Sequence, residues 1–198
     1  MAPRHSAVVR ITHWIATLGF FGLLVSGIAI LLAHPRLYWG ETGSVGTPSL
    51  IDLPLPFVLV GQSGWGRYLH FLAAWVCVLT GLLYVFSGLL MRHFRKNLLS
   101  ASAAYNLLQR IAYLVVVFVL FPLMIWTGLA MSPAIASVLP ALVTAFGGQQ
   151  SARTIHFFIT IALILFVAVH ITMVCRAGFR TRVGAMITGY SAAGKEGA

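Results

Sequence analysis

Four long apolar runs constrain this chain more than any other feature, because each could cross a lipid bilayer as a helix. They span Trp14–Ala33, Tyr68–Met91, Ile111–Met131 and Ile155–Cys175. A helix needs about 20 apolar residues to cross roughly 30 Å of hydrocarbon. Only 8% of the residues are charged, whereas a soluble domain has about 25%. The sequence therefore predicts an integral membrane protein.

The same runs predict an all-α fold. The ten-residue segments of alternating hydrophobicity that are typical of membrane barrels are absent from the sequence. Backbone groups in hydrocarbon must then be satisfied within helices. We expect one transmembrane domain over residues 1–198, built as a four-helix bundle with loops 34–67 and 132–153 on one side. The first run has the length of a full span, so we interpret it as a span and not as a cleaved signal peptide.

Positive charge is concentrated on one predicted side of the membrane. The net charge is +10, and ten of the 13 Lys and Arg residues lie near the termini or in the 92–110 region. Positively charged loops mark the cytoplasmic side. We therefore expect both termini and the 92–110 loop to be cytoplasmic, with loops 34–67 and 132–153 outside. Membrane topology explains the excess of positive charge, so we expect lipid contacts and no nucleic-acid partner.

Two prolines predict breaks in the helices. Pro122 lies inside the third run, where it should kink the helix. Pro140 interrupts "AIASVLPALVTAF", which is too short to span and which we expect to form an interfacial or re-entrant helix on the outer surface. Two long loops on one face indicate either a docking surface or packing over the helix ends, and both interpretations stay open here.

Four of the seven His residues lie within or at the edges of the apolar runs, at positions 13, 70, 156 and 170. An ionisable residue there is a functional hypothesis by default. His156 and His170 are 14 residues apart on one run, so they project within about 40° of each other and lie about 21 Å apart along the axis. The predicted topology places His13 at the inner level with His170. It places His70 at the outer level with His156.

Two facing neutral imidazoles at each level indicate haem iron. Bis-His ligation is typical of electron-transfer haem, whereas zinc would require about four N or S ligands at one level. A proton relay would require carboxylates, and the apolar runs contain none. We predict an outer haem iron between His70 and His156, and an inner one between His13 and His170. The alternative is that four buried His residues make ordinary hydrogen bonds between helices. Without a C-x-x-C-H motif, covalent haem attachment is excluded.

An Arg precedes three of these His residues by one helical turn, in "RITH", "RYLH" and "RTIH". Such an Arg lies on a neighbouring face, nearer the surface, where its guanidinium could make bidentate bonds to a haem propionate. Arg67 and Arg153 would then serve the outer haem and Arg10 the inner one. The alternative is that each Arg only anchors a helix end by snorkelling.

Three glycines share faces with the candidate ligands. Gly27 lies 14 residues beyond His13, at the outer level, and Gly81 and Gly88 lie 11 and 18 residues beyond His70. They could leave gaps for a macrocycle between helices. Small residues also simply allow transmembrane helices to pack closely.

With these four His residues, the sequence resembles the four-helix di-haem b-type cytochromes. These include the membrane subunits of formate dehydrogenases and nickel–iron hydrogenases, and the bacterial cytochrome b561 proteins. The segments "VVRITHW", "YNLLQRIAYLVVVFVLFPLMIWTGLAMSP", "FGGQQSARTIHF" and "MITGY" are most similar to the thiosulfate-reductase-type cytochrome b subunits. The resemblance covers most of the chain. It implies two haem b groups and a multi-pass protein of the bacterial cytoplasmic (inner) membrane.

The resemblance also implies an electron-transfer subunit rather than a substrate-catalytic one. Electrons would pass between quinone and an oxidoreductase at the outer (periplasmic) face, commonly a molybdopterin enzyme of the sulfite-oxidase-like kind. The implied quinone site lies near the inner haem, where polar contacts could come from Tyr105, Gln109, Arg110 and Tyr113.

Two alternatives belong to other functional classes. One is a stand-alone cytochrome b561 that oxidises superoxide and reduces quinone; the long outer loops favour a docked partner instead. The other is a haem-free transporter or assembly scaffold. The lack of charged groups in mid-membrane argues against a substrate path through the bundle.

Overall fold

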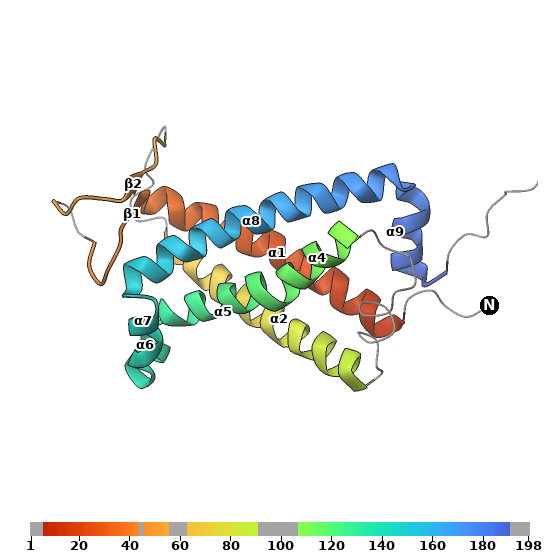
Figure 1. The fold of residues 1–198 in the computed structure, drawn as a ribbon, viewed down its shortest axis with the longest axis horizontal. Coiled ribbons are helices and arrows are strands. Elements are labelled where there is room, and N and C mark those ends of the chain that lie inside the picture. Colours follow the sequence, from red (N-terminus) through yellow and green to blue (C-terminus); the bar gives the residue numbers. More distant parts are fainter. Residues whose placement is uncertain (1–5, 44–45, 56–62, 91–106, 191–198) are drawn as a thin grey trace, which may run out of the picture. The chain divides into compact units, whose positions relative to one another are not determined.

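The computed structural model describes residues 6–43, 46–55, 63–90 and 107–190 (Figure 1). In these ranges the elements are, in chain order, α1 (Ala7–Ala33), β1 (Arg36–Leu37), β2 (Ile51–Asp52), α2 (Ser63–Leu90), α4 (Leu107–Val115), the π-helical segment η1 (Val116–Leu120), α5 (Phe121–Ala130), α6 (Pro133–Val138), α7 (Pro140–Ala145), α8 (Gln149–Arg176) and α9 (Phe179–Thr188). The predicted all-α class is confirmed, apart from one pair of two-residue strands.

The four predicted spans are also confirmed. The helices that are long and apolar enough to cross a membrane are Ala7–Ala33, Gly64–Leu90, Ile111–Ala130 and Gln149–Arg176. The first and last begin six or seven residues earlier than predicted, because each helix continues past the end of its apolar run.

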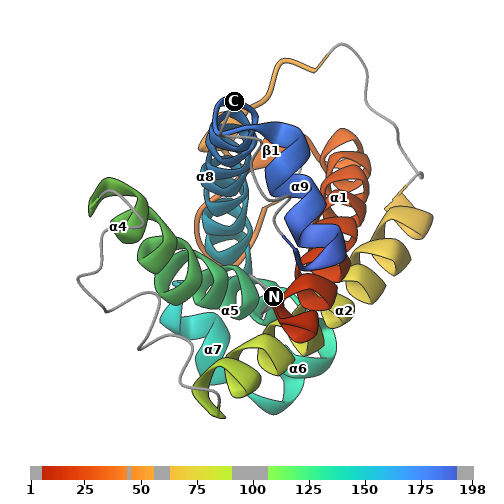
Figure 2. The ribbon, with the colours of Figure 1, turned by 90° about the vertical axis from the view of Figure 1, so that its right-hand side faces the viewer.

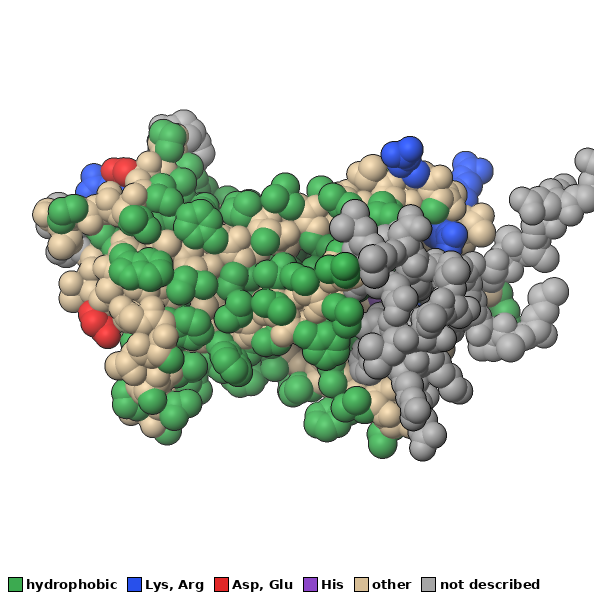
Figure 3. All heavy atoms as spheres, in the orientation of Figure 1, with side chains coloured by type: hydrophobic (Ala, Val, Ile, Leu, Met, Phe, Trp, Pro, Cys, Tyr) green, Lys and Arg blue, Asp and Glu red, His purple; other side chains and the backbone are tan. Residues whose placement is uncertain are grey.

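The spans carry apolar side chains on their outer surfaces. Leu18 is 73% exposed and Leu90 is 85% exposed. Each Å² of such surface in water costs about 25 cal/mol, whereas lipid hydrocarbon solvates it. Figure 3 shows hydrophobic side chains along the long helices, with Lys and Arg near α9 and acidic side chains on the loop that carries β1 and β2. This distribution is typical of a multi-pass membrane protein.

The chain divides into two compact units. Unit 1 contains α1 up to Ile30, α2, α8 from Val167 onwards, and α9. Unit 2 contains the β1–β2 loop, the third span with α6 and α7, and α8 up to Phe166. The single domain expected over residues 1–198 stays a prediction.

In unit 1, α1 and α2 pack through small residues. A Cβ placed on Gly66 would lie 3.2 Å from the Cβ of Ala29, and one on Gly22 would lie 3.5 Å from the Cβ of Ala73. Backbones can approach this closely only where side chains are small, which is the usual basis of helix association in membranes. The contact fixes which face of α2 meets α1.

A tight turn returns the chain from α8 to α1 within unit 1. Gly178, with φ of +94°, starts α9, and Gly189, with φ of +89°, ends it. Figure 2 shows α9 beside the N-terminal part of α1. The indole Nε1 of Trp14 donates a hydrogen bond of 3.1 Å to the carbonyl oxygen of Met186. This bond ties α9 to α1.

Replacing Trp14 by Phe should therefore destabilise unit 1. The change keeps an aromatic ring but removes the donor to Met186, and a lost hydrogen bond of this kind costs about 1 kcal/mol. Thermal unfolding in detergent, followed by circular dichroism, measures the effect. Trp75→Phe is the control, because Trp75 is 56% exposed and the described residues offer its indole no hydrogen bond. Equal losses in both variants would contradict the assigned role of Trp14.

In unit 2, the third span is interrupted where proline predicted a kink. The Phe121 N–H bonds to the carbonyl of Val116, five residues back, in η1 directly before Pro122. Proline lacks an N–H and its ring crowds the carbonyl four residues earlier. A π-helical turn relieves this crowding by widening the helix. The predicted kink thus takes the form of a π turn.

The loop that follows this span, which is predicted to lie outside, forms two short helices. α6 and α7 each have a proline in the first turn, where its missing N–H costs nothing and its fixed φ suits a helix start. The expected interfacial or re-entrant helix is thus two helices instead of one, because Pro140 starts a new helix. Its location at the outer surface stays a prediction.

The other loop that is predicted to lie outside contains a strand pair that the sequence did not predict. Arg36 pairs with Asp52, and Leu37 with Ile51, in antiparallel register. Arg36 and Asp52 also form an ion pair of 3.1 Å. A hydrogen bond with the Tyr38 side chain, followed by the charge of Asp52, raises the pKa of Arg36 above its ordinary value. Arg36 therefore keeps its positive charge beside Asp52.

This loop is bonded to the first turns of α8 by contacts that we call the outer clamp, made by Tyr38, Gly40, Gly148, Ser151 and Thr154. The Gly40 carbonyl accepts the Ser151 N–H at 3.3 Å, and the Gly40 N–H donates to the Ser151 hydroxyl at 2.7 Å. The Thr154 hydroxyl donates to the Tyr38 carbonyl at 2.6 Å. The clamp satisfies N–H groups that a helix N-terminus otherwise leaves without partners.

Candidate functional site

The inner pair of candidate ligands meets within unit 1. The rings of His13 on α1 and His170 on α8 have centroids 6.5 Å apart, with an interplanar angle of 59°. Two metal–imidazole bonds of about 2.0 Å, with each nitrogen about 1.1 Å from its ring centroid, correspond to a centroid separation of about 6 Å. The observed spacing therefore fits one iron ion between the two imidazoles.

His70, on α2 in unit 1, bonds to a hydroxyl on α1. Its Nδ1 lies 3.0 Å from the Oγ of Ser26. That hydroxyl lies 2.6 Å from the carbonyl oxygen of Gly22, to which it donates its proton. With its proton on the Gly22 carbonyl, Ser26 presents an acceptor to the Nδ1–H of His70, and the same imidazole also hydrogen-bonds to the Leu23 backbone. A neutral His70 then has its lone pair on Nε2, the nitrogen that can ligate a metal.

His156, on α8 in unit 2, has the same arrangement. Its Nδ1 lies 2.9 Å from the hydroxyl of Thr127 on α5, and that hydroxyl donates to the carbonyl of Leu123 at 2.7 Å. Ser26 and Thr127 are both fully buried. Donation of the second ring N–H to a protein acceptor is typical of metal-ligating His.

A glycine follows each of these hydroxyl residues and lies against the ring. A Cβ on Gly27 would lie 3.6 Å from Cε1 of His70, and one on Gly128 would lie 3.6 Å from Cε1 of His156. Gly27 was expected at the outer level, and it lies beside the outer candidate His70. Gly81 has open space around it. His70 and His156 thus have equivalent surroundings, each with a buried hydroxyl at Nδ1 and a glycine beside Cε1.

The sequence analysis missed Ser26, Thr127 and Gly128. The signal was present as a repeat: "SGIAI" precedes "RYLHF", and "TGLAM" precedes "RTIHF". His70 belongs to unit 1 and His156 to unit 2, and their pairing around one iron stays a prediction.

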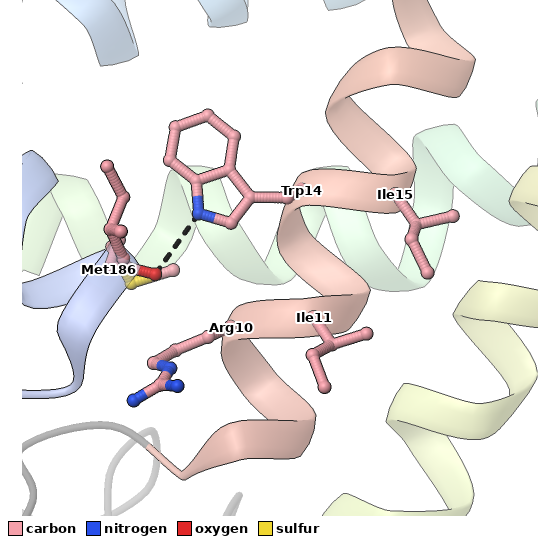
Figure 4. Close-up of a pocket in the computed structure, with 6 residues that line it drawn as sticks. Arg10, Ile11, Trp14, Ile15 and Met186 are labelled. Carbon is pink, nitrogen blue, oxygen red and sulfur yellow. Dashed lines mark hydrogen bonds between the residues drawn. The ribbon is translucent and has the colours of Figure 1, made fainter.

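The three candidate arginines have different surroundings. Arg10 lines a shallow cavity of about 460 Å³ with Trp14 and Met186 (Figure 4), and its buried Nε has no hydrogen-bond partner among the described residues. An anionic oxygen would satisfy this nitrogen. Arg67 is exposed. Arg153 donates to the backbone carbonyl of His34. The propionate roles stay predictions.

One of the four candidate quinone contacts is described with its side chain. Tyr113 packs edge-to-face against Phe166, with ring centroids 5.8 Å apart. Tyr105 lies outside the described residues, as do the side chains of Gln109 and Arg110. The quinone site stays a prediction.

Four apolar spans that carry imidazoles, two of them with ring centroids 6.5 Å apart, define a multi-pass membrane protein with candidate haem ligands. The profile of the prokaryotic cytochrome b561 family matches residues 4–189, and the chain belongs to this family. It is 32% identical to YedZ1 of Azospira oryzae, whose name describes a candidate protein-methionine-sulfoxide reductase subunit; the alignment covers 94% of this chain and 96% of that protein. No solved structure matches this chain.

Family membership confirms the resemblance found in the sequence. The chain is a multi-pass bacterial membrane protein. The family implies haem b as its cofactor and electron transfer as its role.

Proposed function

We propose that this chain is a di-haem b subunit that carries electrons between quinone and an oxidoreductase at the outer face of the membrane. His13 and His170 would hold the inner haem iron, and His70 and His156 the outer one. The observation that carries the proposal is the 6.5 Å separation of the His13 and His170 rings. Bound haem supplies reversible one-electron chemistry at its iron.

The residues of the chain would orient the haem ligands and exclude water from around the haems. The bonds to Ser26 and Thr127 keep a proton on Nδ1 of His70 and His156, so that the lone pair of each neutral ring lies on Nε2, the nitrogen that would ligate iron. The buried Nε of Arg10 offers a cation to a haem carboxylate. The apolar spans exclude water around these groups, and no carboxylate lies within them.

Helix α8 connects the two proposed levels. It runs without a break from Gln149 to Arg176, so His156 and His170 are separated by about 21 Å along its axis. Ligands at two depths on one helix support a path for electrons across most of the hydrocarbon layer. The quinone would react at the inner level, near Tyr113.

The proposed partner is a molybdopterin-type oxidoreductase, for which this chain would be the membrane subunit. The name of the A. oryzae relative, a reductase subunit, supports a partnered role over a stand-alone one. Exposed apolar residues on the outer loops also support it: Trp39 is 60% exposed and Val138 is 82% exposed. Apolar residues on a polar face are typical of docking surfaces.

Haem content and electron donors together test the proposal. The purified chain should contain two haem b per polypeptide by pyridine haemochrome, and a quinol analogue should reduce both. A flux of superoxide should not reduce them at a comparable rate when the partner is absent. Rapid reduction by superoxide would favour the stand-alone superoxide:quinone oxidoreductase. A haem-free protein, purified with haem supply ensured, would overturn the electron-transfer proposal.

A further inference from the structure

We propose that Ser26 and Thr127 are positioning residues that set the tautomer of His70 and His156 and, through it, the affinity and potential of the outer haem. The haem part rests on the function proposed above. The tautomer part concerns the residues of this chain alone. Neither hydroxyl is a ligand, and each would act through the imidazole that it contacts.

The direction of the hydrogen bond follows from the position of one proton. Ser26 Oγ lies 2.6 Å from the Gly22 carbonyl oxygen, and two oxygens at that distance require a proton between them. Ser26 has no second proton to give to the ring. The contact of 3.0 Å to His70 is then an Nδ1–H donated to the serine, beside a hydrogen bond of the same ring to the Leu23 backbone.

Thr127 leads to the same result by the same reasoning. Its proton is used by the Leu123 carbonyl at 2.7 Å, so it accepts the Nδ1–H of His156 at 2.9 Å. The two arrangements lie in different units and use different residue types. Their agreement indicates a requirement of the ligand site.

A buried hydroxyl that already bonds to two backbone carbonyls of its own helix does not need a ring N–H as a third partner. The Thr12 hydroxyl is also buried, and it bonds only to carbonyls of its own helix, Val8 at 2.7 Å and Val9 at 3.2 Å. Ser26 and Thr127 make the same intrahelical bonds and accept a ring N–H as well. Thr12 thus provides a matched control from the same chain.

Loss of the acceptor should weaken the ligand. An acceptor on Nδ1–H fixes the ring orientation and makes Nε2 a stronger donor to iron, and removal of such a partner typically lowers metal affinity 10–100-fold. A stronger donor favours ferric iron, so the midpoint potential of the outer haem should rise when the hydroxyl is removed.

The variants Ser26→Ala and Thr127→Val test the proposal in the full-length chain as purified. Haem loss to apomyoglobin should accelerate at least about 10-fold for one of the two haems, and the midpoint potential of that haem should rise. The low-spin ferric EPR signal of the same haem should shift. Thr12→Val should change none of these readouts. Ser26→Thr and Thr127→Ser, which keep the hydroxyl, should behave as wild type.

Each other outcome is decisive. If Ser26→Ala and Thr127→Val leave haem loss, midpoint potential and EPR signal unchanged, as Thr12→Val should, the proposal is overturned. If Ser26→Thr and Thr127→Ser change these readouts as much as the hydroxyl-free variants do, the effect is due to packing. A wild-type chain without haem would overturn the proposed function and the haem part. Histidine ¹⁵N NMR of the same chain would still decide the tautomer, because two Nδ1–H signals should depend on Ser26 and Thr127.

Discussion

His170→Ala should purify with about one haem b per chain instead of two, and His156→Ala should lose the other haem. An iron held by two imidazoles loses its low-spin site when one is removed. His170 faces His13 at a ring separation that fits one iron, whereas His156 lies against Thr127 in the other unit. Pyridine haemochrome measures the number of haems, and a redox titration identifies which one remains.

Double variants test the pairing itself. His13→Ala combined with His170→Ala should lose no more haem than either single variant, because both changes act on one site. The combination of His13→Ala with His156→Ala should leave no haem. His34→Ala is the control, because Arg153 contacts the backbone carbonyl of His34, which the substitution keeps. Two haems retained in His170→Ala would contradict the ligand assignment.

Gly148→Ala should destabilise the outer clamp and loosen the outer haem. Gly148 has φ of +118°, and a Cβ there would overlap the carbonyl of Gly40. That carbonyl accepts the backbone N–H groups of Gln150 and Ser151, so the loop must move and lose these bonds. Overpacking of this kind costs about 1–3 kcal/mol. Thermal unfolding in detergent and the rate of haem loss measure the effect.

Gly147→Ala separates overlap from backbone strain. Gly147 also has a positive φ, +74°, but its Cβ would meet only the Ser151 hydroxyl, at an ordinary 3.8 Å. It should therefore cost about 1–2 kcal/mol from the left-handed backbone alone. A loss in Gly148→Ala no greater than in Gly147→Ala would show that the Gly40 contact does not hold the clamp.

The spans could be predicted because the bilayer imposes a length and a composition. The helix ends could not, because a helix does not stop where hydrocarbon stops. α1 begins at Ala7 and α8 at Gln149, since backbone bonds continue through Arg10 and Arg153 into the polar region. Proline was informative in both places, at Pro122 and Pro140, because its missing N–H acts locally.

The site was predicted only in part. The four His residues stand out because imidazole is rare in an apolar run. Ser26 and Thr127 do not stand out, since such residues often bond only to their own helix. Their role depends on which helix faces them, and that is set by contacts such as Gly66 against Ala29. The β1–β2 pair is too short to give a periodic signal.

The outer clamp has a thermodynamic consequence. It bonds the loop that carries Tyr38 and Gly40 to Ser151 and to Thr154, and Thr154 lies two residues before His156. A partner docked on that loop would displace the turn that carries His156, the proposed haem ligand. If docking changes the potential of the haem, then reduction of the haem must change the affinity of the partner by the same factor. Each tenfold change in affinity corresponds to about 1.4 kcal/mol. The redox state of the haem would then control the affinity of the partner for this chain.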